Sequence, residues 1–395
     1  MKFERAAFSL SHAWSSPFVR WQGSLADVSS LEFAVAVTGD ALTEREVDRT
    51  AIDQVIFGCT IPQPSSFYAA PWVSGQLGLK DVSGPHIAQA CATSVACIVA
   101  AAAVVESDAQ ALPLVIATDR TSNGPLLVYP RGQGMGGSPV TEHWVLDSFA
   151  ADPATGQPMV ATAENVARDG AMSREALDDL TLLRWQQYQR ALADGRRFQR
   201  KYMQPVSIAR GKKVLRLDAD EGVHPYSAES LSALKPVQSG GVVTYGSQTH
   251  PADGCAGAVL CTAERAKDLS RGGGVARLLA AGFARAGKAE MPKAATTAAQ
   301  RALANAGLSM ADVKLVVTHN PFAVNDLWFS QQTGFALERM NTYGCSLIYG
   351  HPQGPTGLRG IVELVHALQE AGGGTGLFTG CAAGDTGAAL VLRVD

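Results

Sequence analysis

The chain has 395 residues, of which 46% are hydrophobic and 17% charged, and its formal net charge is -3. At roughly 100–200 residues per domain, this length predicts two or three domains. The apolar content excludes wholesale disorder, and the slightly negative charge argues against nucleic acid as a partner. The 40 glycines, more than the usual 7% or so, predict many tight turns or close backbone approaches.

The sequence predicts neither a membrane span nor a secretory signal. The longest apolar run, residues 91–105, contains Thr93 and Ser94 and ends before Glu106. It is therefore shorter than the roughly 18 apolar residues of a membrane helix. No apolar stretch follows the first five residues, as a signal peptide would require. Seven cysteines are an odd count in a long chain, so we expect reduced thiols in a cytoplasmic protein.

Two parts of the chain repeat one order of elements. Residues 51–59 and 311–319 are short β-rich runs, and Cys91 and His351 follow them at the same separation of 260 residues. Apolar residues then recur at helical spacing over 95–105 and 358–368, and buried strands are predicted at 114–118 and 376–380. This βαβ order predicts an α/β fold with two similar halves, each a mostly parallel sheet covered by helices.

The region between the halves differs in composition. Residues 130–158 are rich in Gly and Pro, and a helix is predicted after Ser173, which can cap it. From Arg184 to Arg216 there are ten Lys or Arg residues and one acid, Asp194. Such a stretch forms either a solvated basic face or a site for phosphates. A nucleic-acid surface is a weaker interpretation, because no pattern of stacking aromatics accompanies the charge.

Four residues could carry chemistry. Cys91 begins a predicted helix, where the helix dipole lowers a thiol pKa, although a buried structural cysteine is the alternative. His351 lies in a Gly-rich turn, and His319 and Cys381 end predicted strands, where sites of parallel sheets form. These four converge if the halves pack about a two-fold axis. We expect no metal, because no Cys-x2-Cys pair is present and the four are widely spaced.

The chain resembles the thiolase family in a series of blocks that keep the family's order. Ala90-Cys-Ala-Thr-Ser94 resembles the nucleophile motif, and Met159-Val-Ala-Thr-Ala-Glu-Asn-Val-Ala167 resembles the loop domain over coenzyme A. His319-Asn-Pro-Phe-Ala323 matches the third motif, where many members have Asn in place of His319. Gly350-His-Pro-Gln-Gly354 matches the Gly-His-Pro motif, and Cys381-Ala-Ala-Gly-Asp-Thr-Gly387 matches the C-terminal Cys-x-Gly block.

This resemblance implies a five-layer αβαβα fold of two homologous halves with an inserted loop domain. The N-terminal half would cover residues 1–120 and be completed by 245–268. The loop domain that covers coenzyme A would be 121–244, and the C-terminal half 269–395. The resemblance also implies a homodimer or homotetramer, with or without a small accessory subunit. It gives acyl-CoA molecules as the partners, with no nucleic acid and no membrane.

The resemblance implies an acyltransferase that cleaves 3-ketoacyl-CoA with CoA, or runs the reverse Claisen condensation. Cys91 would form the acyl-enzyme, and His351 would accept its proton and help hold the oxyanion. His319 would act through a positioned water, and Cys381 would protonate the departing acetyl-CoA enolate. The backbone N–H groups of Cys91 and Ala383 would form a second oxyanion hole. Coenzyme A is then a substrate, and no covalently bound cofactor is expected.

Contacts with coenzyme A are expected from residues in both the loop domain and the halves. The expected residues are Thr249, Met159, Phe322, Arg184 and Arg216, with the two arginines for the phosphates. Two alternatives remain beside the thiolase interpretation. One is a ketosynthase-type condensing enzyme of the same superfamily, which usually lacks the second cysteine, so that Cys381 favours a thiolase. The other is a CoA-thioester-binding subunit of a larger complex.

Overall fold

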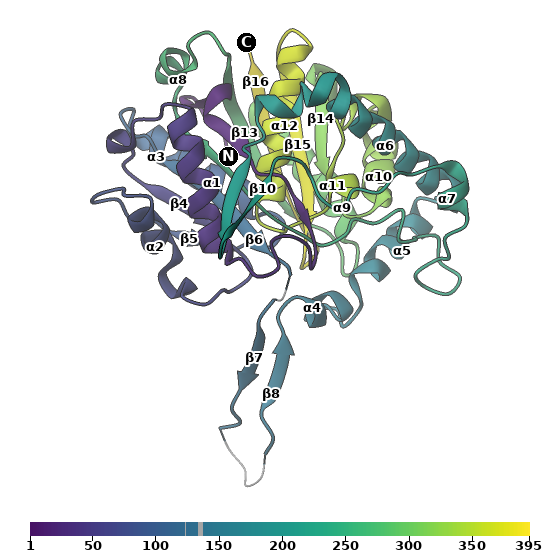
Figure 1. Ribbon diagram of the computed structural model, residues 1–395. Coiled ribbons are helices and arrows are strands. Elements are labelled where there is room, and N and C mark those ends of the chain that lie inside the picture. Colours follow the sequence, from purple (N-terminus) through teal and green to yellow (C-terminus); the bar gives the residue numbers. More distant parts are fainter. Residues whose placement is uncertain (123, 133–136) are drawn as a thin grey trace.

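The chain folds into five alternating layers of helices and sheets, as the resemblance implies (Figure 1). The computed structural model describes residues 1–122, 124–132 and 137–395. Two mixed sheets enclose a central layer of helices and are covered on their outer faces by further helices. The expectation of mostly parallel sheets was wrong, because antiparallel strand pairs outnumber parallel pairs in both sheets. Short 3₁₀ turns lie at Leu10–His12, Arg49–Ala51, Ser66–Tyr68, Gln199–Lys201, Met310–Asp312 and Leu337–Arg339.

The sheet of the N-terminal half has the strand order β2-β11-β6-β4-β5 in the described residues, with β3 also paired to β11. Its strands are β2 (Ala13–Ser15), β3 (Val19–Arg20), β4 (Val55–Gly58), β5 (His86–Ile87), β6 (Leu114–Arg120) and β11 (Ala252–Val259). β4 is parallel to β5 and β6, whereas β11 is antiparallel to β6. Helix α1 (Ser30–Glu44) packs on β6 and β11, and α2 (Ala69–Gln76) packs on β4.

The sheet of the C-terminal half has the order β12-β1-β13-β16-β15-β14 in the described residues. Its strands are β1 (Ala6–Ser9), β12 (Cys261–Thr262), β13 (Val275–Arg285), β14 (Leu315–His319), β15 (Gly374–Ala382) and β16 (Thr386–Val394). α9 (Met291–Ala306) packs on β13, β15 and β16, α10 (Ala323–Thr333) packs on α9, and α8 (Ala263–Ser270) packs on β1. Because β1 comes from the N-terminus, the two halves interlock in a way that the sequence did not indicate.

Two apolar helices, α3 (Thr93–Ser107) and α12 (Thr356–Glu370), pack against each other between the sheets. The segment Ala90–Ser107 has a mean hydropathy of 1.8 and is, by length and composition, able to cross a membrane. The expectation that no segment would reach this length was therefore wrong. In the structure this segment is the core helix α3, and a helix covered by protein on most of its sides requires the same apolar composition.

The segment between β6 and β11, called the inserted segment below, contains a β-hairpin arm and several helices. The arm, β7 (Leu126–Tyr129) and β8 (Val140–His143), projects from the body of the molecule (Figure 1). It is followed by α4 (Leu146–Ala150), α5 (Met159–Asp169), α6 (Arg174–Arg196), β9 (Val206–Arg210), β10 (Lys213–Leu217) and α7 (Ala228–Ser232), and α11 (Ser346–Tyr349) packs on α6. The predicted cap is confirmed, because the Ser173 side chain accepts a hydrogen bond from the Ala176 N–H. The Gly- and Pro-rich stretch 130–158 contains β8 and α4, and residues 133–136 lie outside the described residues.

Two buried ion pairs fix the inserted segment to the body. On α6, Nε of Arg184 donates to Asp326 of α10 at 2.8 Å. On α12, Arg359 donates to both carboxylate oxygens of Asp220, at 2.6 and 2.8 Å. All four side chains are fully buried. Removing one partner of such a pair leaves an uncompensated buried charge, which costs about 3–5 kcal/mol. The two pairs therefore fasten the segment to α10 and α12.

Candidate active site

Each of the three segments that present Cys91, His351 and Cys381 contains a non-glycine residue with a strained backbone. Ala90, Gln353 and Asp385 all have left-handed backbone conformations, with φ of 43°, 69° and 58°. Each lies within four residues of Cys91, His351 or Cys381. Such conformations cost about 1–3 kcal/mol at non-glycine residues and cluster at functional sites. Ten further non-glycine residues of the described chain, among them Gln22 and Arg271, share this conformation, so the strain accompanies the motifs and does not identify the site by itself.

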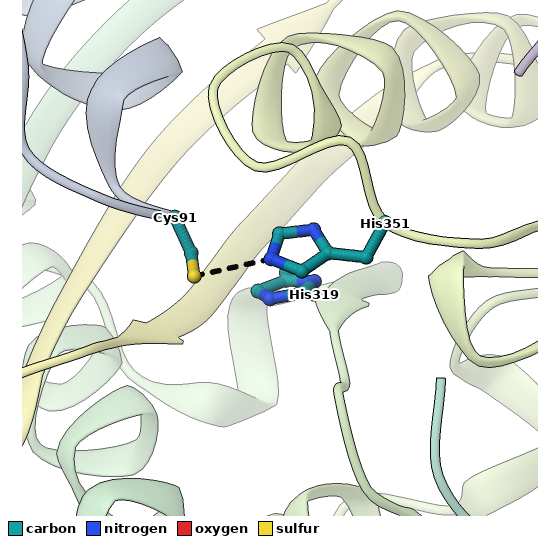
Figure 2. Close-up of side chains that lie close together, drawn as sticks. All are labelled: Cys91, His319 and His351. Carbon is teal, nitrogen blue, oxygen red and sulfur yellow. Dashed lines mark hydrogen bonds between the residues drawn. The ribbon is translucent and has the colours of Figure 1, made fainter. Parts of the chain in front are cut away.

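The turn before His351 can be built only with glycine. Gly350 has φ of 90°, and a Cβ atom there would lie 2.6 Å from Cε1 of His250. Both the backbone conformation and the close approach exclude a larger residue. The turn directs the His351 ring toward Cys91 (Figure 2).

Cys91 and His351 form a hydrogen-bonded pair. Sγ of Cys91 lies 3.1 Å from Nε2 of His351, and Nδ1 of the same ring lies 2.7 Å from Oγ1 of Thr356 (Figure 2). The Cys91 thiol also lies 3.2 Å from Oε1 of Gln353, which can accept its hydrogen. Thr356 orients the ring, and the ring and Gln353 are the two possible acceptors for the thiol hydrogen. This is the arrangement of a nucleophile beside its general base.

His319 lies beneath His351 in the same cluster (Figure 2). The two ring centroids are 4.0 Å apart, and Nδ1 of His319 lies 2.9 Å from Oγ of Ser346. Nε2 of His319 is buried and has no hydrogen-bond partner among the described residues. His319 is therefore held at one nitrogen and has the other free for a ligand or a water.

Cys381 is the second thiol of the site. It is buried at the end of β15, and Nδ2 of Asn325 donates to its Sγ at 3.2 Å. The backbone N–H groups of Ala383 and of Cys91 itself lie against the Cys91 sulfur and act to lower its pKa. Both amides therefore lie beside the sulfur that would carry an acyl group.

Burial determines the charge state of the site. It raises the pKa of Cys91 to about 12, because desolvation outweighs the two amides. The expectation of a pKa lowered by the helix terminus was therefore wrong. Burial also raises the pKa of Cys381, and it lowers the pKa of His319 to about 3 and that of His351 well below its usual range. The resting site thus contains two neutral thiols and two neutral imidazoles.

A mostly apolar cavity of about 290 Å³ leads to Cys91 and His351. It is lined by Cys91, Phe149, Pro158, Met159, Val160, Val237, Tyr245, Gln248, Thr249, Pro251, Met291, Pro321, Phe322, His351, Gln353 and Ala383. Met159, Thr249 and Phe322, which were expected to contact coenzyme A, are among these residues. The inserted segment supplies one wall, and the loops of both halves supply the floor.

The two arginines expected at the phosphates do not line this cavity. Arg184 is fully buried and paired with Asp326, so its prediction as a phosphate ligand was wrong. Arg216 is exposed on β10 and lies outside the cavity lining. Within the basic stretch, Arg197 and Lys201 both pair with Glu370. With Arg184 and Arg196, four of the ten basic residues of this stretch therefore form ion pairs in the described structure.

Sequence reasoning missed four residues that contact the predicted catalytic side chains. They are Gln353, Thr356, Ser346 and Asn325. Gln353 and Thr356 stand two and five residues after His351, and Asn325 opens the helix after the His319 block. Proximity to a motif was the one available signal, since none of the four belongs to a residue pattern with chemistry of its own.

A five-layer fold of two similar halves, with a thiol hydrogen-bonded to an imidazole beside a cavity, is the architecture of an acyltransferase. The chain belongs to the thiolase family. Residues 10–264 match the family model described as thiolase, N-terminal domain, and residues 273–394 match that of thiolase, C-terminal domain.

Individual relatives cover nearly the whole chain. An acetyl-CoA acetyltransferase of Escherichia coli (strain K12) is 28% identical over 94% of this chain and 95% of its own length. A beta-ketoadipyl-CoA thiolase of Pseudomonas knackmussii is 30% identical over 96% of each chain. The crystal structure of human mitochondrial 3-ketoacyl-CoA thiolase superimposes with a TM-score of 0.90 at 25% identity, covering 99% of both chains. A structure of that human enzyme in complex with CoA superimposes with a TM-score of 0.89 at 25% identity, covering 100% of this chain and 99% of the human chain.

Proposed function

We propose that this protein is an acetyl-CoA C-acyltransferase that cleaves 3-ketoacyl-CoA with CoA, or forms it in reverse, through an acyl-Cys91 intermediate. The observation that carries the proposal is the Cys91–His351 pair at the floor of an apolar cavity. A pKa of about 12 keeps Cys91 protonated at neutral pH, so attack requires a base. His351 is neutral and within hydrogen-bond distance, and it is therefore that base.

In the first half-reaction the Cys91 proton moves to Nε2 of His351 and the sulfur attacks the ketone carbon. The bond between the ketone and the α-carbon breaks, and its electron pair leaves with the acetyl-CoA enolate. The protonated His351 stabilises the enolate oxygen, with a water held at Nε2 of His319 as the second donor. Cys381 gives its proton to the enolate carbon, since burial keeps this thiol protonated until then.

In the second half-reaction the thiol of a free CoA attacks the acyl-Cys91 thioester. Cys381, now a thiolate, takes the CoA proton, and the backbone amides of Cys91 and Ala383 hold the oxyanion. Collapse of this intermediate releases the shortened acyl-CoA and returns the proton from His351 to Cys91. Each thiol therefore ends as it began, and two moderate barriers replace one high barrier.

The arrangement around the site supports three further parts of the proposal. Residues 121–244 form the loop domain that covers coenzyme A. One half consists of residues 1–120 with 245–268, and the other of residues 269–395. Met159 of the loop domain and Thr249 and Phe322 of the two halves contact coenzyme A. Exposed apolar side chains on the β7–β8 arm, among them Leu126 and Val128, support assembly into a homodimer or homotetramer. Seven free cysteines support a reducing, cytoplasmic environment.

The decisive experiment follows the loss of 3-ketoacyl absorbance when acetoacetyl-CoA and longer, branched or aromatic 3-ketoacyl-CoA substrates are mixed with CoA. Thiolysis of at least one of them is expected, together with a mass increase of one acyl group on the intact protein. Cys91→Ser removes this mass increase, and Cys97→Ser, a buried thiol elsewhere on α3, is the matched control. Acylation that persists in Cys91→Ser, or no thiolysis with any substrate, contradicts the proposal.

The ketosynthase alternative predicts a different partial reaction. A decarboxylating condensing enzyme would release CO₂ from a malonyl thioester and would not depend on Cys381. The Cys381–Asn325 contact favours the thiolase, because it holds a second proton-transfer group in the site. Release of CO₂ from malonyl-CoA that survives in Cys381→Ala would favour the ketosynthase instead.

A further inference from the structure

Three metal-ligating side chains converge on one point at the floor of the cavity. The sulfur of Cys91 and one nitrogen each of His319 and His351 all lie within 4.8 Å of one another (Figure 2). They come from three segments that are far apart in the sequence, with His319 at the end of β14, which is why the spacing of the residues argued against a metal. Spacing identifies ligands within one local motif, but it carries no information on ligands brought together by packing.

The orientation of each ring leaves Nε2 facing the centre of the cluster. Nδ1 of His351 is paired with the Thr356 hydroxyl, and Nδ1 of His319 with the Ser346 hydroxyl. Metal-binding histidines use a hydrogen-bond acceptor at the outer nitrogen, usually a carboxylate, a backbone carbonyl or water, to fix the ring and its tautomer, and here a hydroxyl group occupies that position. Nε2 of His319 is buried without a partner among the described residues, a cost that a bound ion would remove.

We propose that Cys91, His319 and His351 form a binding site for a soft or borderline divalent cation such as Zn²⁺ or Cd²⁺, and that its occupation reversibly inhibits the enzyme. One sulfur and two imidazole nitrogens suit these ions, and the group contains no carboxylate that would favour Mg²⁺ or Ca²⁺. Three protein ligands leave the fourth tetrahedral position open toward the cavity, where a water can bind.

The binding step is a simple exchange of a proton for a metal ion. The Cys91 S–H bond breaks, the sulfur keeps the electron pair and donates it to the cation, and the proton leaves to solvent. No atom changes oxidation state. Each imidazole binds the cation through the lone pair of Nε2, so an unprotonated ring loses no proton on coordination. Once coordinated, the sulfur and His351 are withdrawn from acyl transfer.

The test uses the full chain, freed of metal with EDTA and without substrate, so that its outcome does not depend on the acyl-CoA specificity. Titration with Cd²⁺ is expected to produce a thiolate-to-cadmium charge-transfer band that saturates at one ion per chain. Zn²⁺ followed by calorimetry is expected to bind at the same stoichiometry, to release about one proton per ion and to protect Cys91 from iodoacetamide. Mg²⁺ is expected to do none of these.

Two variants and one chemical block identify the ligands. Cys91→Ser is expected to abolish the band, and His319→Asn to weaken binding by at least the roughly 10–100-fold that loss of a mere supporting residue costs. Cys261→Ser, a buried thiol on β12, is the matched control and is expected to bind normally. Alkylation of Cys91 in the unaltered chain must also abolish binding, whatever the stability of the variants. Absence of saturable binding, or undiminished binding in His319→Asn or in the alkylated chain, overturns the proposal.

Discussion

The two halves place different residues at equivalent positions of the same fold. β4 and β14 are each parallel to the next strand in their sheet, β6 and β15. The first residue pair of one register, Val55 and Leu114, can be aligned with the first pair of the other, Leu315 and Gly376. Counting along the strands from these pairs, Cys59 corresponds to His319 and Asp119 corresponds to Cys381. In the C-terminal half these positions face the proposed reaction site. In the N-terminal half they hold backbone in place.

Asp119 shows what the N-terminal positions do. Its carboxylate accepts hydrogen bonds from the N–H groups of Thr60, Ile61 and Gly354, at 2.8, 2.9 and 2.7 Å. Gly354 belongs to the loop that carries His351, so the N-terminal half anchors a loop of the other half that we propose to be catalytic. The comparison teaches that equivalent strand ends can provide either a reactive group, as proposed for Cys381, or an anchor for the backbone, as Asp119 does.

The largest expected effect comes from the reactive member of the pair. Cys381→Ala removes the proposed acid, so kcat for thiolysis is expected to fall by about 100- to 10,000-fold with little change in folding stability. Steady-state kinetics and urea unfolding measure the two. Cys255→Ala, a buried thiol on β11, is the control. A kcat within tenfold of the unaltered enzyme would remove Cys381 from the mechanism.

The anchor is expected to show the opposite pattern. Asp119→Ala leaves three backbone N–H groups without their acceptor, so the free energy of unfolding is expected to fall by about 3 kcal/mol or more. Urea denaturation measures this loss, and kcat falls with it as the Gly354 loop loosens. If stability is unchanged while kcat collapses, Asp119 is a reactive group and the contrast between the halves fails.

The stability of the packing around the central helix α12 is expected to depend on pH, through His366. On α12, His366 is buried against Tyr202, and its pKa is lowered to about 4, chiefly by burial and with the positive charge of Lys201 adding to it. Below pH 6.5 the unfolded chain binds a proton that the folded chain resists, so stability falls as pH decreases toward 4.

His366→Phe keeps a ring against Tyr202 and removes this titration. The variant is therefore expected to gain about 2 kcal/mol relative to the unaltered chain between pH 7.5 and pH 5, from about 1.36 kcal/mol per pH unit. Urea unfolding at both pH values measures this difference. A difference that does not vary with pH would mean that His366 titrates normally.

The smallest effect is expected at the counterpart of His319. Cys59 donates to Asp119 at 3.3 Å and to the Ile61 carbonyl at 3.4 Å. Cys59→Ala is expected to cost about 1 kcal/mol of stability and to leave kcat unchanged. His319→Ala at the equivalent position is expected to lower kcat instead. Equal effects of the two substitutions on kcat would contradict the division of roles.

The fold and part of the site could be predicted because their signals are local. The repeat of strand, helix and strand, the Ser173 cap and the glycine turn before His351 depend on neighbouring residues. The helix dipole at Cys91 is also local, but its predicted effect had the wrong sign, because burial by the rest of the chain outweighs it.

The contacts that escaped prediction join distant segments. Gln353 reaches Cys91 across the two halves, and Arg184 meets Asp326 at a separation of 142 residues. A count of charges between Arg184 and Arg216 treats every arginine as available to solvent. It could not reveal that Arg184 forms a buried ion pair with Asp326, because a long-range ion pair leaves no pattern in either segment.

The two buried ion pairs of the inserted segment bear on how this enzyme could acquire a new substrate. Arg184–Asp326 and Arg359–Asp220 tie α6 and the loop of Asp220 to α10 and α12, so the backbone of the inserted segment is held in place at both points. Change in acyl preference must then come from the size of lining side chains such as Met159 and Phe322. A library confined to those positions can reshape the cavity while leaving the proton-transfer groups where they are.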